Sequence, residues 1–150
     1  MIRIQRQDFS VEEEYQKLRN KQGDQVGSIC TFTGLVRDFG DRDDVTGIFL
    51  EHYPGMTESS LQMIIDQAEE QWQLHDVTIV HRIGDLDLKA QIVFVGVSAS
   101  HRGDAFAACE FIMDYLKVDA PFWKKERCAE SEQWVEAKLS DQKRAKKWQK

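Results

Sequence analysis

Stretches of apolar, β-branched and aromatic residues predict that much of the chain forms strands. The longest of them, QIVFVGVSAS at residues 91–100, is almost continuously apolar. Such a run is typical of a central strand that other elements cover on both faces. The expected strands cover residues 2–6, 28–36, 45–53, 76–84, 91–100, 122–128 and 133–137.

Segments with helical periodicity lie between these strands. Ser10 and Glu13 form a capping box that opens a short helix through about Leu18. A second helix starts at PGMTE, and a third covers about residues 103–118. Each of these two helices has apolar residues recurring on one face, which predicts that this face of each helix is buried. They are Leu61, Ile64, Ile65, Ala68 and Trp72 in the second helix and Phe106, Cys109, Ile112, Met113 and Leu116 in the third.

Polar segments and the order of the elements complete the fold prediction. DFGDRDD at residues 38–44 predicts a loop, DLDLKA at residues 85–90 predicts a turn, and a basic helix is expected at the C-terminus. Strand–helix–strand alternation joined to antiparallel pieces favours an α+β fold, a two-layer mixed sandwich. With 150 residues, 41% of them hydrophobic, the chain is expected to form one domain, residues 1–150.

The net charge of −6 argues against general binding to nucleic acid, because a polyphosphate would be repelled at long range. The C-terminal DQKRAKKWQK is nevertheless basic. It forms either a solvated helix face, which we favour, or a contact surface for RNA or an acidic protein. No apolar run has the length of a membrane span and the N-terminus lacks the apolar core of a signal peptide, so we expect a cytoplasmic protein without membrane contact.

Motifs for metals, nucleotides and common hydrolases are missing from the sequence. Cys30, Cys109 and Cys128 form no CxxC pair and are expected to be reduced packing residues. His52 and His81 lie inside predicted strands, so we interpret them as core or edge histidines. Because HxH, HExxH, Walker, GxGxxG and GxSxG motifs are all missing, neither a metal nor a cofactor is expected.

Two lysines have unusually apolar sequence neighbours. In FIMDYLKVDAPFWKKE, residues 111–126, Lys117 ends the third helix, and Lys124 follows a break at Pro121 and two aromatic residues. A chain reversal at the break could return Lys124 to the cleft of Lys117. Desolvation and mutual repulsion would lower the pKa of one amine, which could act as a base or nucleophile while the other stabilises an anion. Alternatively, the lysines only complement the helix dipole and the solvated surface.

Further cationic residues lie at the ends of predicted elements. His101 and Arg102 start the third helix, where free backbone N–H groups and the helix dipole favour an anion. They predict a phosphate pocket, unless Ser100 simply caps the helix and Arg102 points to solvent. Arg37 ends the strand TFTGLVR and is either a substrate clamp or an ion-pair partner of the acidic loop that follows.

Six segments together resemble the large, catalytic subunits of molybdopterin synthase. They are TFTGLVR, LEHYPGMTE, HRIGDL, IVFVGVSASHR, FIMDYLKVDAPFWKKE and WVEAKLSD, and the resemblance runs from about residue 8 to the C-terminus. It implies an α/β hammerhead fold with an additional small antiparallel sheet. It also implies a sulfurtransferase of molybdenum cofactor biosynthesis, which installs the two dithiolene sulfurs that convert cyclic pyranopterin monophosphate (precursor Z) into molybdopterin.

The resemblance implies partners as well. Sulfur would arrive as a thiocarboxylate on the C-terminal Gly-Gly tail of a small ubiquitin-like subunit, and a homodimer of large subunits would form the centre of a heterotetramer. Two alternatives are a non-catalytic adaptor that docks a ubiquitin-like partner and a sensor of phosphate metabolites. The adaptor would need the groove but not both lysines, and the sensor does not explain an enclosed Lys117.

The resemblance also assigns residues. Lys117 and Lys124 match the two essential lysines. Lys117 is expected beside the terminal carbonyl of the small subunit as general acid and base, and Lys124 is expected to orient the substrate and stabilise anions. Lys138 in WVEAK matches a basic residue that reaches the active site of the neighbouring large subunit; it is often arginine, whose bidentate geometry lysine lacks. The remaining substrate-binding residues implied are Phe32, Arg37, Met113, His101 and Arg102.

Overall fold

The computed structural model describes residues 1–21, 23–37, 45–128, 132–135 and 139–149, so the predicted loop at 38–44 lies outside the described residues. This part of the chain forms two four-stranded sheets and four α-helices, which confirms the α+β prediction. Sheet A has the strand order β1 (Ile2–Gln5), β4 (Leu74–Arg82), β6 (Gln91–Ala99) and β2 (Ser28–Leu35). Sheet B has the order β5 (Gly84–Asp87), β3 (Val45–His52), β7 (Phe122–Cys128) and β8 (Glu132–Val135).

Sheet A is mixed, because β1 runs parallel to β4 whereas β6 is antiparallel to both β4 and β2. β6 is the central strand that its apolar sequence predicted, and residues 93–99 are all buried. Its side chains alternate between two cores. Val93, Val95 and Val97 join one cluster, while Phe94 joins another with Phe9 and Leu18.

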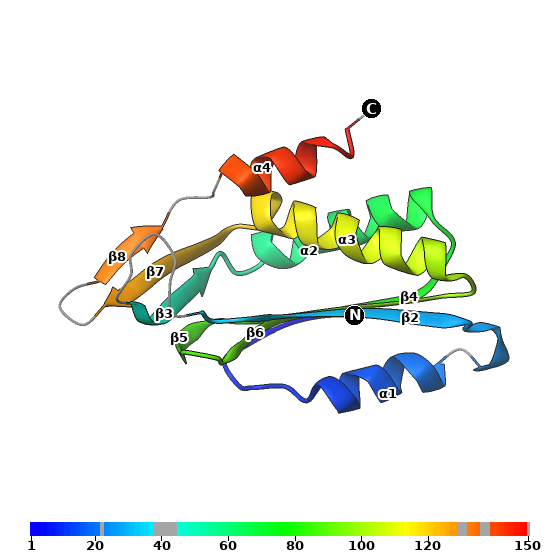
Figure 1. Cartoon of the computed structure of the whole chain (residues 1–150), viewed down its shortest axis with the longest axis horizontal. Helices are drawn as coiled ribbons and strands as arrows, with labels where there is room; N and C mark the ends of the chain where they lie inside the picture. Colours follow the sequence, from blue (N-terminus) through cyan, green and yellow to red (C-terminus); the bar gives the residue numbers. More distant parts are fainter. Residues whose placement is uncertain (22, 38–44, 129–131, 136–138, 150) are drawn as a thin grey trace.

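The helices cover both faces of sheet A (Figure 1). α1 (Val11–Lys21) lies on one face, and α2 (Met56–Gln71) and α3 (Arg102–Asp119) lie on the other. The α1 cap is the predicted one, since the Glu13 amide donates to Ser10 Oγ at 3.2 Å. A short 3-10 turn, η1 (Gly23–Gln25), follows α1, and α4 (Leu139–Lys146) packs on α3. No helix in the described segments is long and apolar enough to cross a membrane.

The buried faces of α2 and α3 largely follow the predicted periodicity. Leu61, Ile64, Ile65 and Ala68 of α2 and Cys109, Ile112 and Leu116 of α3 are buried, with Met113 and Trp72 packed at the edge of the same core. The prediction for Phe106 is wrong, because this side chain is 64% exposed. Ala105 and Ala108 face the core instead, and Phe106 points about 100° away from Ala105 around the helix.

The segment predicted as a turn at residues 85–90 is partly a strand. β5 pairs with β3 in an antiparallel register, with Leu86 opposite Ile48. Leu86 is buried while Asp85 and Asp87 are exposed, so the short segment has the period-2 alternation of a strand. Arg127 of β7 pairs with both aspartates, at 3.5 and 2.7 Å. The turn prediction was wrong for these residues because the aspartates are the polar face of a strand.

The basic C-terminal residues contact the chain's own helix α3. Arg144 donates to Asp114 at 3.1 Å and to Glu110 at 2.8 Å. Trp148 donates its indole N–H to Asp114 at 2.7 Å and packs its ring against Phe111. Part of the basic charge is therefore neutralised within the chain, which supports the interpretation of this segment as a packed, solvated helix.

Sheets A and B meet where β4 ends and β7 begins. His81 of β4 is buried and stacks on Phe122 of β7, with ring centroids 3.7 Å apart and planes at 14°. His52, at the end of β3, contacts the same Phe122 ring at 6.4 Å. Burial lowers the pKa of His81 to about 4, and the charge of Lys117 acts in the same direction. The junction therefore holds a neutral imidazole between the sheets.

The buried His81 should make the fold less stable in mild acid. Its pKa is about 4 in the folded chain against an ordinary value of 6.5, so between these values the unfolded chain binds the proton more readily. Stability is therefore lost as pH falls from about 6.5 towards 4, and this group should account for about 2 kcal/mol between pH 7 and pH 5. Urea unfolding of the wild type and of His81→Phe at both pH values measures the difference. Equal losses in the two proteins would contradict the assignment to His81.

Candidate active site

Arg37 and Lys124 line the same small cavity, which has a volume of about 70 Å³. Lys124 reaches it because it pairs with Leu50 across β3 and β7 and so lies on the inner face of sheet B. The other residues that line the cavity are Leu35, Val36, Val45, Ile48, Ile92 and Glu126. The structure therefore brings two predicted cationic residues, 87 positions apart in sequence (124 − 37), to one apolar recess.

Glu126 adds a carboxylate to this cavity. It lies two residues beyond Lys124 on the same face of β7 and is only 3% exposed. A carboxylate at this depth requires a compensating positive charge. The cationic residues that line the cavity with it in the described chain are Arg37 and Lys124. We had not identified Glu126 from sequence, although its spacing from Lys124 on a predicted strand was the available signal.

Lys117 lies in the last turn of α3 and is exposed, whereas Lys124 is half-buried. The expectation that both lysines are enclosed is therefore wrong for the isolated chain. Lys117 is nevertheless near the junction of the sheets, because its charge acts on the pKa of His81. Only Lys124 receives its shielding from the chain's own residues.

The two lysines lie on either side of Phe122 along the chain, at the same end of the fold. The chain makes a local turn between them, with the Phe122 amide donating to the Ala120 carbonyl at 2.8 Å, and β7 then continues in the same general direction as α3 (Figure 1). Lys124 follows Phe122 on the same strand face, roughly 7 Å further along β7. The ring of Phe122 in turn stacks on His81, which senses the charge of Lys117. The chain therefore turns but does not reverse at the helix break, and a cleft shared by the two lysines stays a prediction.

His101 and Arg102 lie at the opposite end of α3 from Lys117. The helix has 18 residues, and its rise places Arg102 roughly 22 Å from Lys117. Both residues are exposed, and no side chain caps the helix. Ser100, the alternative cap, instead donates its hydroxyl to the Gln25 carbonyl at 3.0 Å and contacts His75. The helix N-terminus is thus available to an anion, but one chain does not bring it to the lysines.

The other predicted pocket residues are dispersed. Phe32 lies on β2 at the edge of sheet A and is 42% exposed. Met113 belongs to α3 and packs against the core between this helix and sheet A. Neither is among the residues that line the cavity of Arg37 and Lys124. Lys138 lies outside the described residues.

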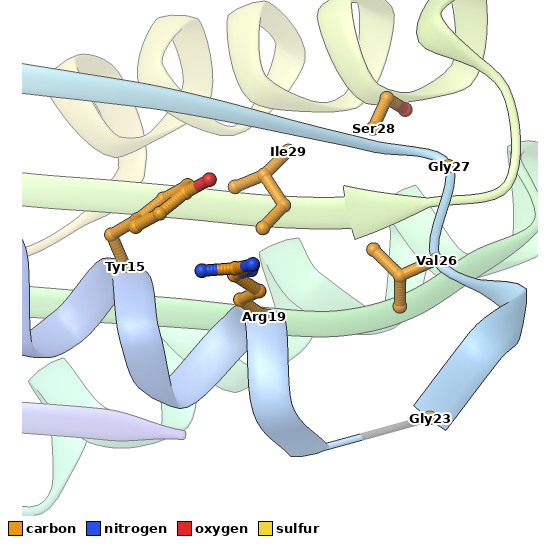
Figure 2. Close-up of a pocket in the computed structure, with 7 residues that line it drawn as sticks. All are labelled: Tyr15, Arg19, Gly23, Val26, Gly27, Ser28 and Ile29. Carbon is orange, nitrogen blue, oxygen red and sulfur yellow. The ribbon is translucent and has the colours of Figure 1, made fainter.

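A larger recess, of about 510 Å³, lies on the α1 side of sheet A. Figure 2 shows Tyr15 and Arg19 of α1 facing the start of β2 across this recess. None of the site residues predicted from sequence lines it, and sheet A separates it from α3. The size of a recess therefore does not identify the candidate site in this chain.

Two histidines, His52 and His81, lie at the junction of the sheets and contact Phe122, two residues before Lys124. His81 is a core histidine, as interpreted, and the charge of Lys117 adds to the effect of burial in lowering its pKa. The Nδ1 atom of His52 is buried without a hydrogen-bond partner among the described residues, and Glu58 Oε1 is 3.8 Å away. Their signal in the sequence was a histidine at the end of each of two otherwise apolar strands.

Comparison with known proteins gives relatives along the whole chain. The MoaE protein family matches residues 4–119. A molybdopterin synthase catalytic subunit from Vibrio cholerae is 53% identical over 148 residues, covering 99% of this chain and 97% of the relative.

Solved structures agree with these relatives. A molybdopterin biosynthesis MoaE protein from Burkholderia ambifaria superposes with a TM-score of 0.85 at 48% identity, covering 99% of this chain and 97% of the other. A Helicobacter pylori chain, from a protein–protein complex of subunits 1 and 2 of molybdopterin-converting factor, has a TM-score of 0.76 at 17% identity and covers 90% of each chain, which shows the common fold. The family match and the identities together show that this chain belongs to the MoaE family, that of the molybdopterin synthase catalytic subunits.

Proposed function

We propose that the chain transfers sulfur from the C-terminal thiocarboxylate of a small ubiquitin-like subunit to cyclic pyranopterin monophosphate, forming the dithiolene of molybdopterin. Membership of the MoaE family supports this reaction. The observation in the structure that carries it is the gathering of Arg37 and Lys124 at one cavity, with Lys117 at the same end of the fold. A set of cations suits a reaction in which both the sulfur donor and the pterin substrate are anions.

The proposed chemistry builds negative charge at successive steps. The thiocarboxylate sulfur attacks a carbon of the substrate side chain and forms a thioester between tail and substrate, while an ester bond of the cyclic phosphate breaks. Water then hydrolyses the acyl C–S bond, which leaves the sulfur on the substrate and a carboxylate on the tail. Charge develops on phosphate, enolate-like and acyl oxygens, and positioned cations in a partly dry recess stabilise it. Lys124 and Arg37 supply these cations, while Lys117 exchanges protons at the carbonyl of the tail.

The exposure of Lys117 fits a site that is completed by a partner. The glycine tail of the small subunit is narrow enough to run over the end of α3 and cover this amine. Lys117 would then be desolvated only in the complex, because the isolated chain leaves it in solvent. A small subunit bound at this end is thus both the sulfur donor and one wall of the active site.

The length of α3 supports a homodimer within the heterotetramer. Because Arg102 lies roughly 22 Å from Lys117 in one chain, a single chain cannot present both to one small substrate. We infer that the uncapped N-terminus of α3, with His101 and Arg102, binds the phosphate of a substrate held at the lysines of a second copy. A two-fold axis would then generate two such sites. Phe32, Met113 and Lys138 remain proposed as substrate contacts in this assembled site.

Replacing Lys117 with alanine should lower molybdopterin formation by about 100-fold or more, because it removes the proton donor and acceptor at the tail carbonyl. Binding of the small subunit should change little, since the lysine is one exposed side chain of a larger contact. Reconstitution with precursor Z and thiocarboxylated small subunit measures the activity, and calorimetry measures the binding. Lys125→Ala is the matched control, because Lys125 lies on the opposite face of β7, over the Phe49 ring. Wild-type turnover by Lys117→Ala would refute the role.

A hybrid dimer tests whether two chains share each site. One chain carries Lys117→Ala and the other Arg102→Ala, each with a different affinity tag so that the hybrid can be purified. If the lysines of one chain work with the helix N-terminus of the other, one of the two sites is intact and the hybrid should have about half of the wild-type activity. Both parent homodimers should be nearly inactive. A hybrid as inactive as its parents would show that each site uses residues of a single chain.

A further inference from the structure

Three rings meet beside the two lysines and join the sheets. His81 comes from sheet A, while Phe122 and His52 come from sheet B. The His81 and Phe122 rings stack at 3.7 Å, and His52 approaches Phe122 at 6.4 Å with its plane tilted by 35°. We call these residues the ring stack. It is a direct contact between β4, which carries His81 one residue before its end, and β7, which carries Lys124.

The charge state of His81 follows from its surroundings. Its Nδ1 atom lies 2.8 Å from the Arg82 carbonyl oxygen, which can only accept a hydrogen bond, so Nδ1 carries the hydrogen. Burial and the nearby Lys117 of α3 and His52 of β3 disfavour a second proton on this ring. Two acidic residues lie near His52: Glu58 of α2, 3.8 Å from its Nδ1, and Glu51 of β3, which accepts from its amide at 3.1 Å. His81 therefore presents a flat, neutral face to Phe122.

Phe122 connects the start of β7 to sheet A as well as to its own sheet B. It is the first residue of the strand, its amide donates to the Ala120 carbonyl, and it lies between Lys117 and Lys124 in the sequence. Its backbone pairs with His52 across β3 and β7, and its ring is held by His81. The start of β7 is thus paired to β3 within sheet B and stacked on His81 of sheet A.

We propose that His81 is a positioning residue for sulfur transfer, because its ring holds Phe122 and thereby fixes the spacing between Lys117 and Lys124. The inference rests on the proposed function and adds a residue that touches neither substrate nor small subunit. A histidine that served only the core would change stability without changing turnover in the folded enzyme. A positioning histidine changes kcat, because small displacements of reacting groups lower the rate steeply.

Three variants separate these cases. His81→Ala removes the ring and should lower kcat for molybdopterin formation by about 10–100-fold, with the KM for the small subunit changed by less than about 2-fold. His81→Phe keeps a flat ring against Phe122 and should restore kcat to within about 3-fold of wild type. Val80→Ala is the control for loosening of β4, because Val80 is equally buried but faces the α1 side; it should keep the wild-type kcat. All assays use the complete complex at a temperature where each variant is folded.

The outcomes decide clearly for or against the inference. Wild-type kcat in folded His81→Ala, a His81→Phe enzyme as slow as His81→Ala, or a Val80→Ala enzyme equally slow would each overturn it. If His81→Ala does not fold, Phe122→Leu replaces it, since leucine keeps apolar volume but not the stacked ring; the same fall in kcat is expected, and wild-type kcat would overturn the proposal. Failure of the proposed function would look different, because the wild-type complex itself would then form no molybdopterin.

Discussion

The packing of α3 on sheet A determines where the cationic residues of the site lie. Its buried face runs from Ala105 to Leu116 and closes over the valines of β6. Each large side chain buried there contributes roughly 1.5–3 kcal/mol, so tilting or sliding the helix would uncover a substantial part of the core. The helix is therefore a rigid spacer. Its uncapped N-terminus and the lysine of its last turn stay at opposite ends of the helix, and any reaction that needs both must recruit a second chain.

At the junction of the two sheets, charged side chains line a mainly apolar recess. Arg37, which is exposed, follows two residues after the end of β2, whereas Lys124 and Glu126 come from β7, so the cavity is formed only when the sheets are correctly docked. Opposite charges interact more strongly there than in water, and each offsets the desolvation of the other. The aromatic and imidazole rings at the same junction provide contact without adding charge. Docking of the two sheets therefore also brings Arg37 and Lys124 to one cavity.

The sequence predicted the regular parts of this fold because their patterns are strong. The apolar run of β6 and the face of α2 around Leu61 leave few alternatives, whereas Phe106 was misplaced because alanines turned a different side of α3 to the sheet. The resemblance to a family indicated the lysines. No local sequence pattern, however, shows that the length of α3 separates Lys117 from Arg102 by roughly 22 Å. For a related reason, His81 was interpreted only as a core or edge histidine and Glu126 was not singled out. Their relevance depends on which strands the fold sets side by side.

The contrast between Lys117 and Lys124 has a physical consequence for the proposed reaction. Lys124 is held in a recess with a carboxylate nearby and has its environment fixed before any partner binds. Lys117 is in solvent in the free chain and so has no desolvation to overcome during folding. Covering it would then require interaction energy from the docking tail, and the change in its reactivity would appear only when the sulfur donor is present. In such a design, the amine that meets the tail carbonyl becomes reactive when the tail arrives, while the cations that stabilise the product anions are preorganised throughout.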